Sequence, residues 1–275
     1  MSPCLIRILT PDGRLEPAAY TAESLAEALP HEPDGIYTIA STFQRTRALK
    51  LDAHLDRMED SARREGIPLR LDRARLRAAL RQMIEEAGHA ESRFRITVPR
   101  AQPDHVILSL ESFTPPGPEL IAQGVRCATV PGLARRNPEA KTSDWAHNRR
   151  QAALPPGVYE GLLVSADGSI LEGFSSNFYA VLDGALRTAG AGVLPGVAQQ
   201  IVFEVAPAVL PVQREAARLA DIPRMAEAFL TSSSRGVIPI VEIDGQPIGS
   251  GAPGPHTQAI RARYNAWVDS HLEEL

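Results

Sequence analysis

Cysteine is nearly absent from this 275-residue sequence, and so are long apolar runs. The two cysteines, Cys4 and Cys127, cannot form a disulfide framework or a structural zinc site. No stretch approaches the length of a membrane-spanning segment, so no membrane partner is expected and a cytoplasmic enzyme is the default class. The seven histidines are scattered without metal-ligand spacing, so no metal is expected either.

Excess positive charge is also lacking, because the net charge is −4 and the isoelectric point is near 6.0. This balance argues against a general nucleic-acid or anionic-membrane binder. Several catalytic signatures are missing as well: His-Glu-x-x-His, Cys-x-x-Cys, Gly-x-Ser-x-Gly and the phosphate-loop Gly-Lys-Ser/Thr. Zincin, thioredoxin-like, serine-hydrolase and nucleotide-loop chemistry are therefore not expected.

Lysine is the scarcest basic residue, with Lys50 and Lys141 set against 27 arginines. Arginine is always charged, whereas a lysine that is buried or crowded by cations can lose its proton and become a nucleophile that forms Schiff bases. Lys50 has an ordinary setting next to leucines, but Lys141 lies in a polar stretch with arginines on both sides. Lys141 is therefore the candidate for chemistry.

The pattern of apolar residues predicts helices and strands that are mixed rather than strictly alternating. Asp52 and Asp72 are expected to cap the first two helices, which Gly66 and Gly88 would end. The expected helices cover residues 54–65, 73–87, 197–205 and 257–271. The expected strands cover residues 94–98, 106–110, 125–130, 161–164, 170–171, 178–182, 185–186, 228–230 and 237–243. Hairpin turns are expected at Asp167-Gly168 and at Asp183-Gly184. The run around Lys141 is expected to be irregular, and the fold class is α+β.

The stretch Thr114-Pro115-Pro116-Gly117-Pro118 breaks any regular element and is the best domain boundary. We therefore expect two domains. A small N-terminal α/β domain would cover residues 1–117. A larger C-terminal domain, carrying Lys141, would cover residues 118–275.

An enzyme that uses pyridoxal 5'-phosphate needs a lysine, an acid for the pyridine nitrogen and a phosphate cradle, and the sequence offers each of them. Glu172 ends an apolar strand beside a small polar turn. Gly196 precedes a helix whose first amides, at Val197 and Ala198, would be open to an anion. Hydroxyl groups in residues 231–234, among them Ser232 and Ser233, and the guanidinium of Arg57 would add to the cradle.

The order of these segments resembles that of the class IV aminotransferases, the fold-type IV pyridoxal phosphate enzymes, over most of the chain. The most specific match is Glu172-Gly173-Phe174-Ser175-Ser176-Asn177. The other matching segments are Asp34-Gly35-Ile36-Tyr37, His54-Leu55-Asp56-Arg57-Met58, Lys141-Thr142-Ser143-Asp144, Leu194-Pro195-Gly196-Val197-Ala198 and residues 229–239. The resemblance implies a two-domain fold, a homodimer, and pyridoxal 5'-phosphate in the cleft between the domains.

The resemblance also assigns a role to each matching residue. Lys141 falls on the Schiff-base lysine, and Glu172 on the partner of the pyridine nitrogen. The phosphate-binding positions fall on Arg57, Val197, Ala198 and Ser233.

The substrate side departs from the family pattern. Thr38 follows Tyr37 where a glutamate is common, and Trp145 lies near the place of a tyrosine found in branched-chain members. Arg100 and His105 lie in the neighbourhood of an Arg-x-His pair that D-amino acid members use for the substrate carboxylate, without reproducing its spacing. Candidate substrate residues are therefore Tyr37, Arg100, His105, Trp145 and Arg149.

Three functions remain open at this stage. The first is a transaminase acting on a small amino acid, D- or branched-chain, and a 2-oxo acid. The second is aminodeoxychorismate lyase, which releases pyruvate with the same lysine. The third is a non-catalytic ligand-binding protein on the same fold, which would not need both Lys141 and Glu172.

Overall fold

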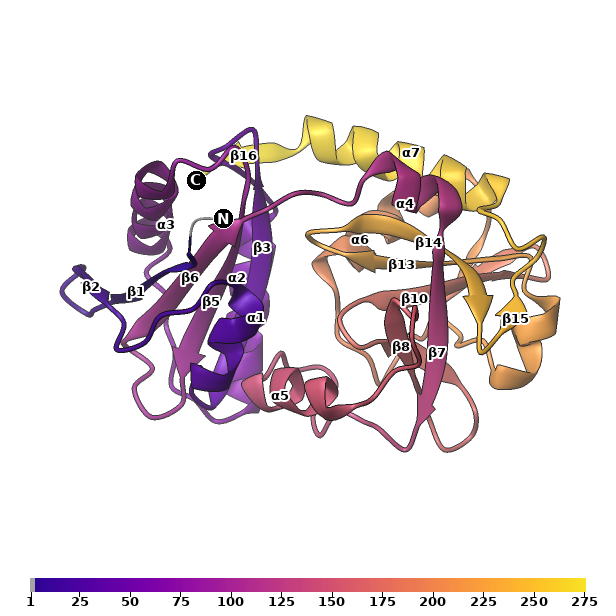
Figure 1. The fold of residues 1–275 in the computed structure, drawn as a ribbon, viewed down its shortest axis with the longest axis horizontal. Coiled ribbons are helices and arrows are strands. Elements are labelled where there is room, and N and C mark those ends of the chain that lie inside the picture. The colour runs from indigo at the N-terminus through magenta and orange to yellow at the C-terminus, as the bar shows by residue number, and fades with distance from the viewer. Residues whose placement is uncertain (1–2) are drawn as a thin grey trace. The chain divides into compact units, whose positions relative to one another are not determined.

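The computed structural model describes residues 3–275, and these residues form two compact units (Figure 1). Unit 1 comprises the described residues up to Thr114 together with Ala140–Gln151 and His271–Leu275. Unit 2 comprises Pro115–Glu139 and Ala152–Ser270. The sequence placed the boundary three residues later and assigned Lys141 to the C-terminal domain, whereas the structure groups the Lys141 segment with unit 1.

Unit 1 is built on one antiparallel sheet in the order β16-β4-β3-β5-β6-β1-β2. Its strands are β1 (Leu5–Leu9), β2 (Leu15–Pro17), β3 (Gly35–Phe43), β4 (Arg47–Leu49), β5 (Ser92–Pro99), β6 (Val106–Ser112) and β16 (Leu272–Glu274). Its helices are α1 (Leu25–Ala28), the 3-10 turn η1 (Leu29–His31), α2 (Leu51–Arg64), α3 (Arg73–Ala87) and α5 (Ser143–Gln151).

The two faces of this sheet are covered by different helices. Strand residues alternate between faces, so Ile36, Phe94 and Ile96 point to the side where α2 and α3 bury their apolar stripes. On the opposite face, Leu25 of α1 packs over Ile6, and Ala146 of α5 packs against Tyr37. Tyr37 therefore lies on the face that α1 and α5 cover.

The ends of the two long helices agree with the sequence only in part. Asp72 caps α3 by accepting a hydrogen bond from the Arg75 amide at 3.0 Å, and Gly88 ends it with a positive φ of 65°, as expected. The expectation for α2 was wrong at its start. The cap residue is Lys50, which has no side-chain cap bond, and Asp52 lies inside the first turn, where its charge favours the helix dipole.

Unit 2 contains a sheet in the order β12-β11-β10-β13-β14-β7-β8-β9, with β15 added beside β14. Its strands are β7 (Val125–Pro131), β8 (Glu160–Val164), β9 (Ile170–Gly173), β10 (Asn177–Leu182), β11 (Ala185–Arg187), β12 (Val212–Gln213), β13 (Glu227–Ser232), β14 (Gly236–Ile243) and β15 (Gln246–Pro247). Its helices are α4 (Pro118–Gln123), α6 (Val197–Val205) and α7 (Pro255–Ser270), with 3-10 turns η2 (Ala206–Ala208) and η3 (Leu219–Arg224).

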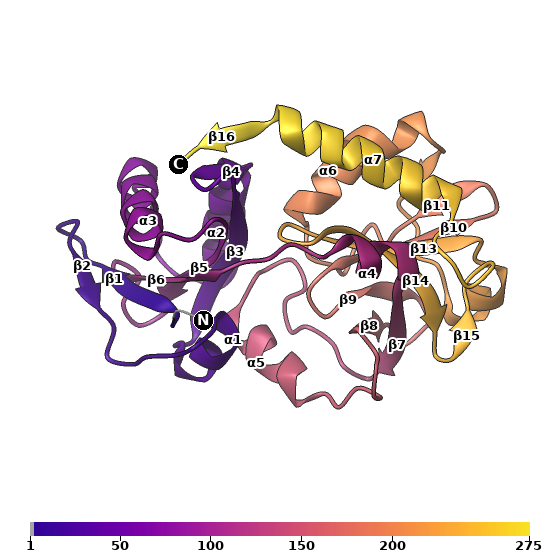
Figure 2. The same ribbon diagram turned by 45° about the horizontal axis from the view of Figure 1, so that its top comes forward.

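The sheet of unit 2 closes on itself. Strand β9 pairs with β8 and also with β10, through Glu172 and Asn177, so that β10, β13, β14, β7, β8 and β9 form a ring. Apolar side chains such as Phe178, Leu230 and Ile240 form a core here. Helices α6 and α7 lie side by side against β13 and β14 (Figure 2). Both ends of the Glu172–Asn177 segment are thus fixed by strand pairing.

Both hairpin turns expected in unit 2 are present. Asp183 and Gly184 join β10 to β11 with φ of 51° and 76°, the doubly positive pattern that an Asp-Gly turn supplies.

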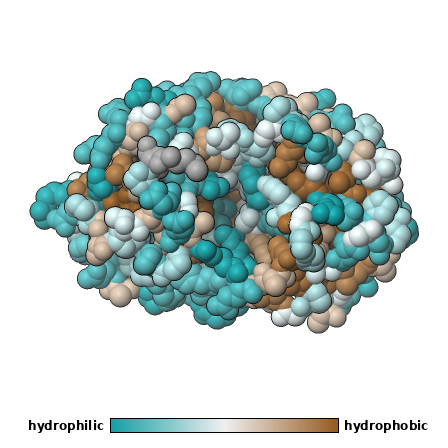
Figure 3. All heavy atoms as spheres, viewed as in Figure 1, coloured by the Kyte–Doolittle hydropathy of each residue, from teal (hydrophilic) through white to brown (hydrophobic). Residues whose placement is uncertain are grey.

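Hydrophobic side chains gather over unit 2 on the face drawn in Figure 3, whereas unit 1 is mostly hydrophilic there. None of the helices within residues 3–275 combines the length and the apolar character that crossing a bilayer requires.

The segment that carries Lys141 is more regular than the sequence suggested. Residues 143–151 form α5, with Asp144 in its first turn and Arg149 and Arg150 in its last, the charge order that complements a helix dipole. Thr142 pairs with Ile36 of β3, and Ser143 Oγ donates to the Gly35 carbonyl at 3.1 Å. These bonds to β3 explain why the segment belongs to unit 1 although its sequence neighbours belong to unit 2.

Candidate active site

Lys141 is fixed through its main chain. Its carbonyl accepts the Tyr37 amide at 3.0 Å, and its own amide donates to the Ser61 hydroxyl of α2 at 3.1 Å. Its Nζ lies 4.8 Å from the centroid of the Tyr37 ring. Strand β3 and helix α2 together therefore set the position from which the amine reaches out.

Tyr37 lies under a second cation as well. The Arg95 guanidinium carbon is 5.2 Å from the ring centroid, and Tyr37 is 2% exposed. Arg95 itself is buried, with Glu32 at 3.7 Å and the Leu25 carbonyl at 3.4 Å. Cations near an aromatic face are attracted to it, so the Tyr37 ring interacts with two side chains of the same charge.

Arg57 lies in a group of polar side chains on the other face of β3. Its Nη2 donates to Thr38 Oγ1 at 3.2 Å, and the same hydroxyl is 2.8 Å from His54 Nδ1. Burial first, and then the charges of Arg57 and Lys141, hold the pKa of the His54 imidazole well below its ordinary value. His54 is therefore neutral at physiological pH, and Thr38 links it to the guanidinium where the family often has a glutamate.

Glu172, the one carboxylate among the predicted site residues, is buried, at 1% exposed. Its Oε1 is 2.9 Å from Arg135 Nε, and its Oε2 accepts the Leu194 amide at 3.2 Å. The side chain of Arg135 is only 3% exposed. The carboxylate is thus held by a cation on one side and by the loop before α6 on the other.

The start of α6 is shaped by Asn177. The Asn177 amide group donates to the Leu194 carbonyl at 3.0 Å, and a Cβ on Gly196 would lie 2.0 Å from Asn177 Oδ1. Only glycine fits this contact. Gly196 is the N-cap of α6 and has no side-chain cap bond, so the first amides, at Val197 and Ala198, remain for an anion.

Ser232 and Ser233 lie at the turn between β13 and β14, where Arg235 connects several loops. Arg235 Nε donates to Ser232 Oγ at 2.9 Å, and its other nitrogens reach Glu160 at 2.9 Å and Ser175 Oγ at 2.8 Å. Burial alone would raise the pKa of the Glu160 carboxyl, but the Arg235 charge and the hydrogen bonds from Ser175 hold it below its ordinary value. A charged Glu160 therefore ties the serine turn to the Glu-Gly-x-Ser-Ser-Asn segment.

The predicted substrate residues have varied surroundings. Arg100 bonds to Asp34 Oδ2 at 2.7 Å and to Glu65 through its carbonyl, at 2.7 Å, and its carboxylate, at 3.1 Å. His105 Nδ1 is 2.9 Å from its neighbour Asp104. Trp145 is buried at 3% exposed, and Arg149 lies half-buried in the last turn of α5.

The structure thus collects the predicted residues in two groups. Unit 1 holds Lys141, Arg57 and Tyr37, and unit 2 holds Glu172, the start of α6 and the serine turn. Sequence reasoning did not select Arg135, Glu160 or Ser61, because nothing in their local sequence marks them. Arg235 and His54 lay inside matching segments, which was the available signal.

Comparisons with known proteins identify the family. The family model described as "Amino-transferase class IV" matches residues 35–243. The chain belongs to the class IV aminotransferases. It is 26% identical over 265 residues to a D-alanine aminotransferase of Bacillus licheniformis, covering 91% of this chain and 93% of that protein. It is also 26% identical over 258 residues to a branched-chain-amino-acid aminotransferase of Pseudomonas aeruginosa, covering 84% and 82%.

Solved structures agree on the fold of this class IV aminotransferase. A T.th. branched-chain amino acid aminotransferase with pyridoxamine 5'-phosphate superposes with a TM-score of 0.82 at 20% identity, covering 100% of this chain and 99% of that one. Class IV aminotransferases are pyridoxal 5'-phosphate enzymes that transfer amino groups, and this chain is one of them. The α+β, fold-type IV prediction is confirmed.

The residues present fit that cofactor. Gly196 lets the Asn177 side chain pack against the start of α6, and the amides there, which no side chain caps, suit a phosphate. Glu172, kept beside Arg135, is an acid suited to a protonated ring nitrogen. Lys141 supplies the amine.

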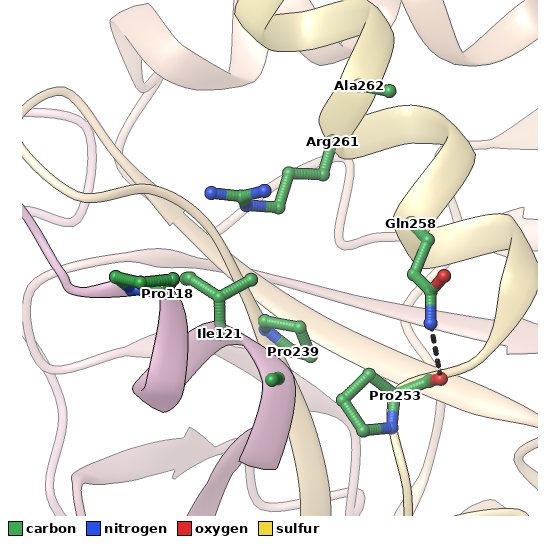
Figure 4. A pocket seen from close by; sticks show the side chains of 8 residues that line it. Pro118, Ile121, Pro239, Pro253, Gln258, Arg261 and Ala262 are labelled. Carbon is green, nitrogen blue, oxygen red and sulfur yellow. Dashed lines mark hydrogen bonds between the residues drawn. The ribbon is translucent and has the colours of Figure 1, made fainter.

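A separate cavity of about 450 Å³ in this class IV aminotransferase lies between α4, β14 and α7 of unit 2 (Figure 4). Ile121 and Pro239 line it, and Arg261 extends into it from α7. None of the predicted site residues belongs to its lining. No cluster of three or more His, Cys, Asp or Glu side chains suited to a metal occurs in the part of the chain that the structure describes.

Proposed function

We propose that this class IV aminotransferase moves an amino group between a small amino acid, D- or branched-chain, and a 2-oxo acid. The relatives named above act on D-alanine or on branched-chain amino acids, which supports a small aliphatic donor. The observation that carries the proposal is the presence of both a lysine fixed at its main chain and a buried carboxylate paired with an arginine. A binding protein would need neither.

We assign the following roles to the chain's own residues. The Lys141 amine moves the proton at the substrate Cα. Glu172 holds the proton of the cofactor's ring nitrogen. Arg57, the amides of Val197 and Ala198, and the hydroxyl groups of Ser232 and Ser233 bind the phosphate. When bound, pyridoxal 5'-phosphate supplies a carbonyl carbon for the amino group and a ring that withdraws electrons.

On the substrate side, Tyr37, Trp145 and Arg149 remain our candidates for the pocket, and Arg100 and His105 for the carboxylate. The bonds of Arg100 to Asp34 and Glu65 mean that it would have to exchange partners to serve this role. We also propose that the enzyme is a homodimer, as the family resemblance suggests, and that it works in the cytoplasm. The gel-filtration mass of the purified protein tests the dimer.

The function is tested by the visible spectrum of the purified protein with added cofactor. D-alanine, D-glutamate, L-leucine and L-glutamate are added one at a time. We expect a yellow band that bleaches with one enantiomer and returns with a 2-oxo acid. A yellow protein that none of them bleaches, and that instead releases pyruvate from aminodeoxychorismate, would establish the lyase. A protein that takes up no cofactor would refute both.

The lysine is tested with a matched pair of charge-conserving variants. Lys141→Arg should abolish the yellow band, because a charged guanidinium does not condense with the cofactor's carbonyl carbon as a lysine amine does, whereas Lys50→Arg should leave the band intact. Borohydride reduction followed by peptide mass spectrometry should place the cofactor on Lys141. Since the chain has one other lysine side chain, the assignment is direct. Label on Lys50 alone would contradict the proposal.

A further inference from the structure

The ion pair between Arg135 and Glu172 is almost completely buried. The two side chains are 3% and 2% exposed, and the Nε–Oε1 distance is 2.9 Å. Both residues belong to unit 2, Arg135 on the loop after β7 and Glu172 on β9. Removing two charges from water costs several kcal/mol per ion, so a buried pair of this kind is weak evidence for added stability. A different reason for its presence is needed.

A second buried pair in unit 2 provides the comparison. Glu160 and Arg235 also lie 2.9 Å apart, but Ser175 donates two hydrogen bonds to Glu160, and Arg235 bonds to Ser232 and Ser175 as well. That pair joins strand β8, the Ser175 segment and the turn between β13 and β14, so it has an evident structural role. Glu172 instead has the Arg135 charge at one carboxylate oxygen and the amide of Leu194 at the other.

The charge of Arg135 has a direct consequence for Glu172. A buried carboxyl favours its neutral form unless a cation lies near it, and a guanidinium stays charged at every relevant pH. Arg135 therefore keeps Glu172 an anion inside the protein. The Leu194 amide fixes the other oxygen, so the orientation of the carboxylate is set as well as its charge.

We propose that Arg135 is a positioning residue that keeps Glu172 charged and oriented toward the ring nitrogen of the cofactor. This inference rests on the proposed function, in which Glu172 holds the proton of that nitrogen. Arg135 itself acts through Glu172. Without Arg135, burial would favour the neutral form of Glu172, and a neutral carboxyl balances a positively charged ring less well.

The test uses Arg135→Met, Arg135→Lys, Glu172→Gln and the double variant Arg135→Met/Glu172→Gln in the full-length enzyme with cofactor. We expect Arg135→Met to lower kcat by about 10- to 100-fold, the range typical of removing a residue that orients a metal-binding side chain. Arg135→Lys restores the charge without the guanidinium geometry and should recover part of the loss. The double variant should be no worse than Glu172→Gln. Arg126→Met, an exposed arginine of β7, is the control.

Two readouts separate this role from simple structural support. In Arg135→Met the acid limb of the kcat–pH profile should move to higher pH, since Glu172 then needs a higher pH to ionise. A cofactor analogue with carbon in place of the ring nitrogen should remove the difference between Arg135→Met and the wild type. A structural role would leave the pH profile in place and give the same loss with both cofactors.

The outcomes distinguish the two levels of the proposal. If the wild type binds no cofactor, or if Glu172→Gln is as active as the wild type, the role of Glu172 in the proposed function fails. If Glu172→Gln is impaired but Arg135→Met behaves as the wild type, the inference about Arg135 is refuted. If Arg135→Met does not fold, Arg135→Lys decides: an unshifted acid limb and an unchanged kcat in that variant would also refute it.

Discussion

Unit 1 fixes Lys141 through the main chain, whereas unit 2 fixes Glu172 through the side chain. The Lys141 backbone has partners on β3 and α2, while its amine contacts the face of Tyr37. Both carboxylate oxygens of Glu172 have a partner: the Arg135 guanidinium at one and the Leu194 amide at the other. The difference matches the proposed tasks, because a group that moves a proton needs a mobile end on a fixed base. A group that only holds charge gains from being immobile.

The largest loss of stability is expected from a substitution at Gly196 of unit 2, where an added side chain would collide with its neighbours. A Cβ there would meet Asn177 Oδ1 at 2.0 Å, next to the proposed phosphate cradle. Gly196→Ala should lower the free energy of unfolding by about 1–3 kcal/mol, the usual cost of overpacking. It should also weaken cofactor binding. Urea unfolding and a cofactor titration of the apoprotein measure the two effects.

Gly117→Ala is the matched control, because Gly117 is also a helix N-cap. The two glycines have similar φ, −69° and −72°, but a Cβ on Gly117 would meet nothing within 4 Å. We expect this variant to bind cofactor as the wild type does. Equal behaviour of the two variants would show that the Asn177 contact does not shape the cradle.

A second test concerns Glu227, a buried carboxylate that caps a helix and has no proposed contact with the cofactor. Glu227 accepts the amides of His256 and Thr257 at the start of α7, at 3.0 and 2.7 Å. Glu227→Gln should cost about 1–2 kcal/mol at neutral pH, since charge at a helix N-terminus and charge-assisted hydrogen bonds are lost. Exposed Glu215→Gln serves as the control.

The pH dependence of this effect follows from the surroundings of Glu227. Burial alone would raise the pKa of its carboxyl, but the hydrogen bonds from Thr257 and His256 hold it below the ordinary value of 4.5. A lowered folded-state pKa stabilises the protein above the unfolded pKa, and this gain is lost as the pH falls through the folded value. The difference in unfolding free energy between the wild type and Glu227→Gln should therefore shrink as the pH falls. An advantage that grows below pH 4.5 would contradict this account.

Sequence reasoning succeeded where a residue acts on the backbone next to it in the sequence. Asp72 caps the start of α3 and Gly88 ends it, as expected, and the Asp183-Gly184 turn is present. The domain of Lys141 was assigned differently from the structure, because its membership depends on pairing with Ile36, about a hundred positions away. Arg135 and Glu160 were missed for the same reason. A buried arginine and an exposed one look alike until the chain has folded.

Ser61 tests the main-chain support of Lys141 in unit 1. Its hydroxyl accepts the Lys141 amide at 3.1 Å and donates to the Arg57 carbonyl at 2.7 Å. Ser61→Ala should cost about 1 kcal/mol, the net value of a typical hydrogen bond, and should lower kcat more than KM. Ser270→Ala, which loses a similar bond to the carbonyl four residues earlier, should leave kcat unchanged. An unchanged kcat in both would show that Lys141 does not depend on this contact.

The smallest effect is expected at an exposed ion pair of unit 2. Arg224 Nη2 lies 2.7 and 2.9 Å from the Asp183 carboxylate oxygens, a distance like that of Arg135 and Glu172, yet the two side chains are 59% and 53% exposed. Water screens such a pair, so Arg224→Ala should change the unfolding free energy by less than about 1 kcal/mol. Cofactor affinity should not change at all. If Arg224→Ala lowered activity as much as Arg135→Met, burial would not distinguish the two arginines. The argument that the buried Arg135 charge sets the state of Glu172 would then fail.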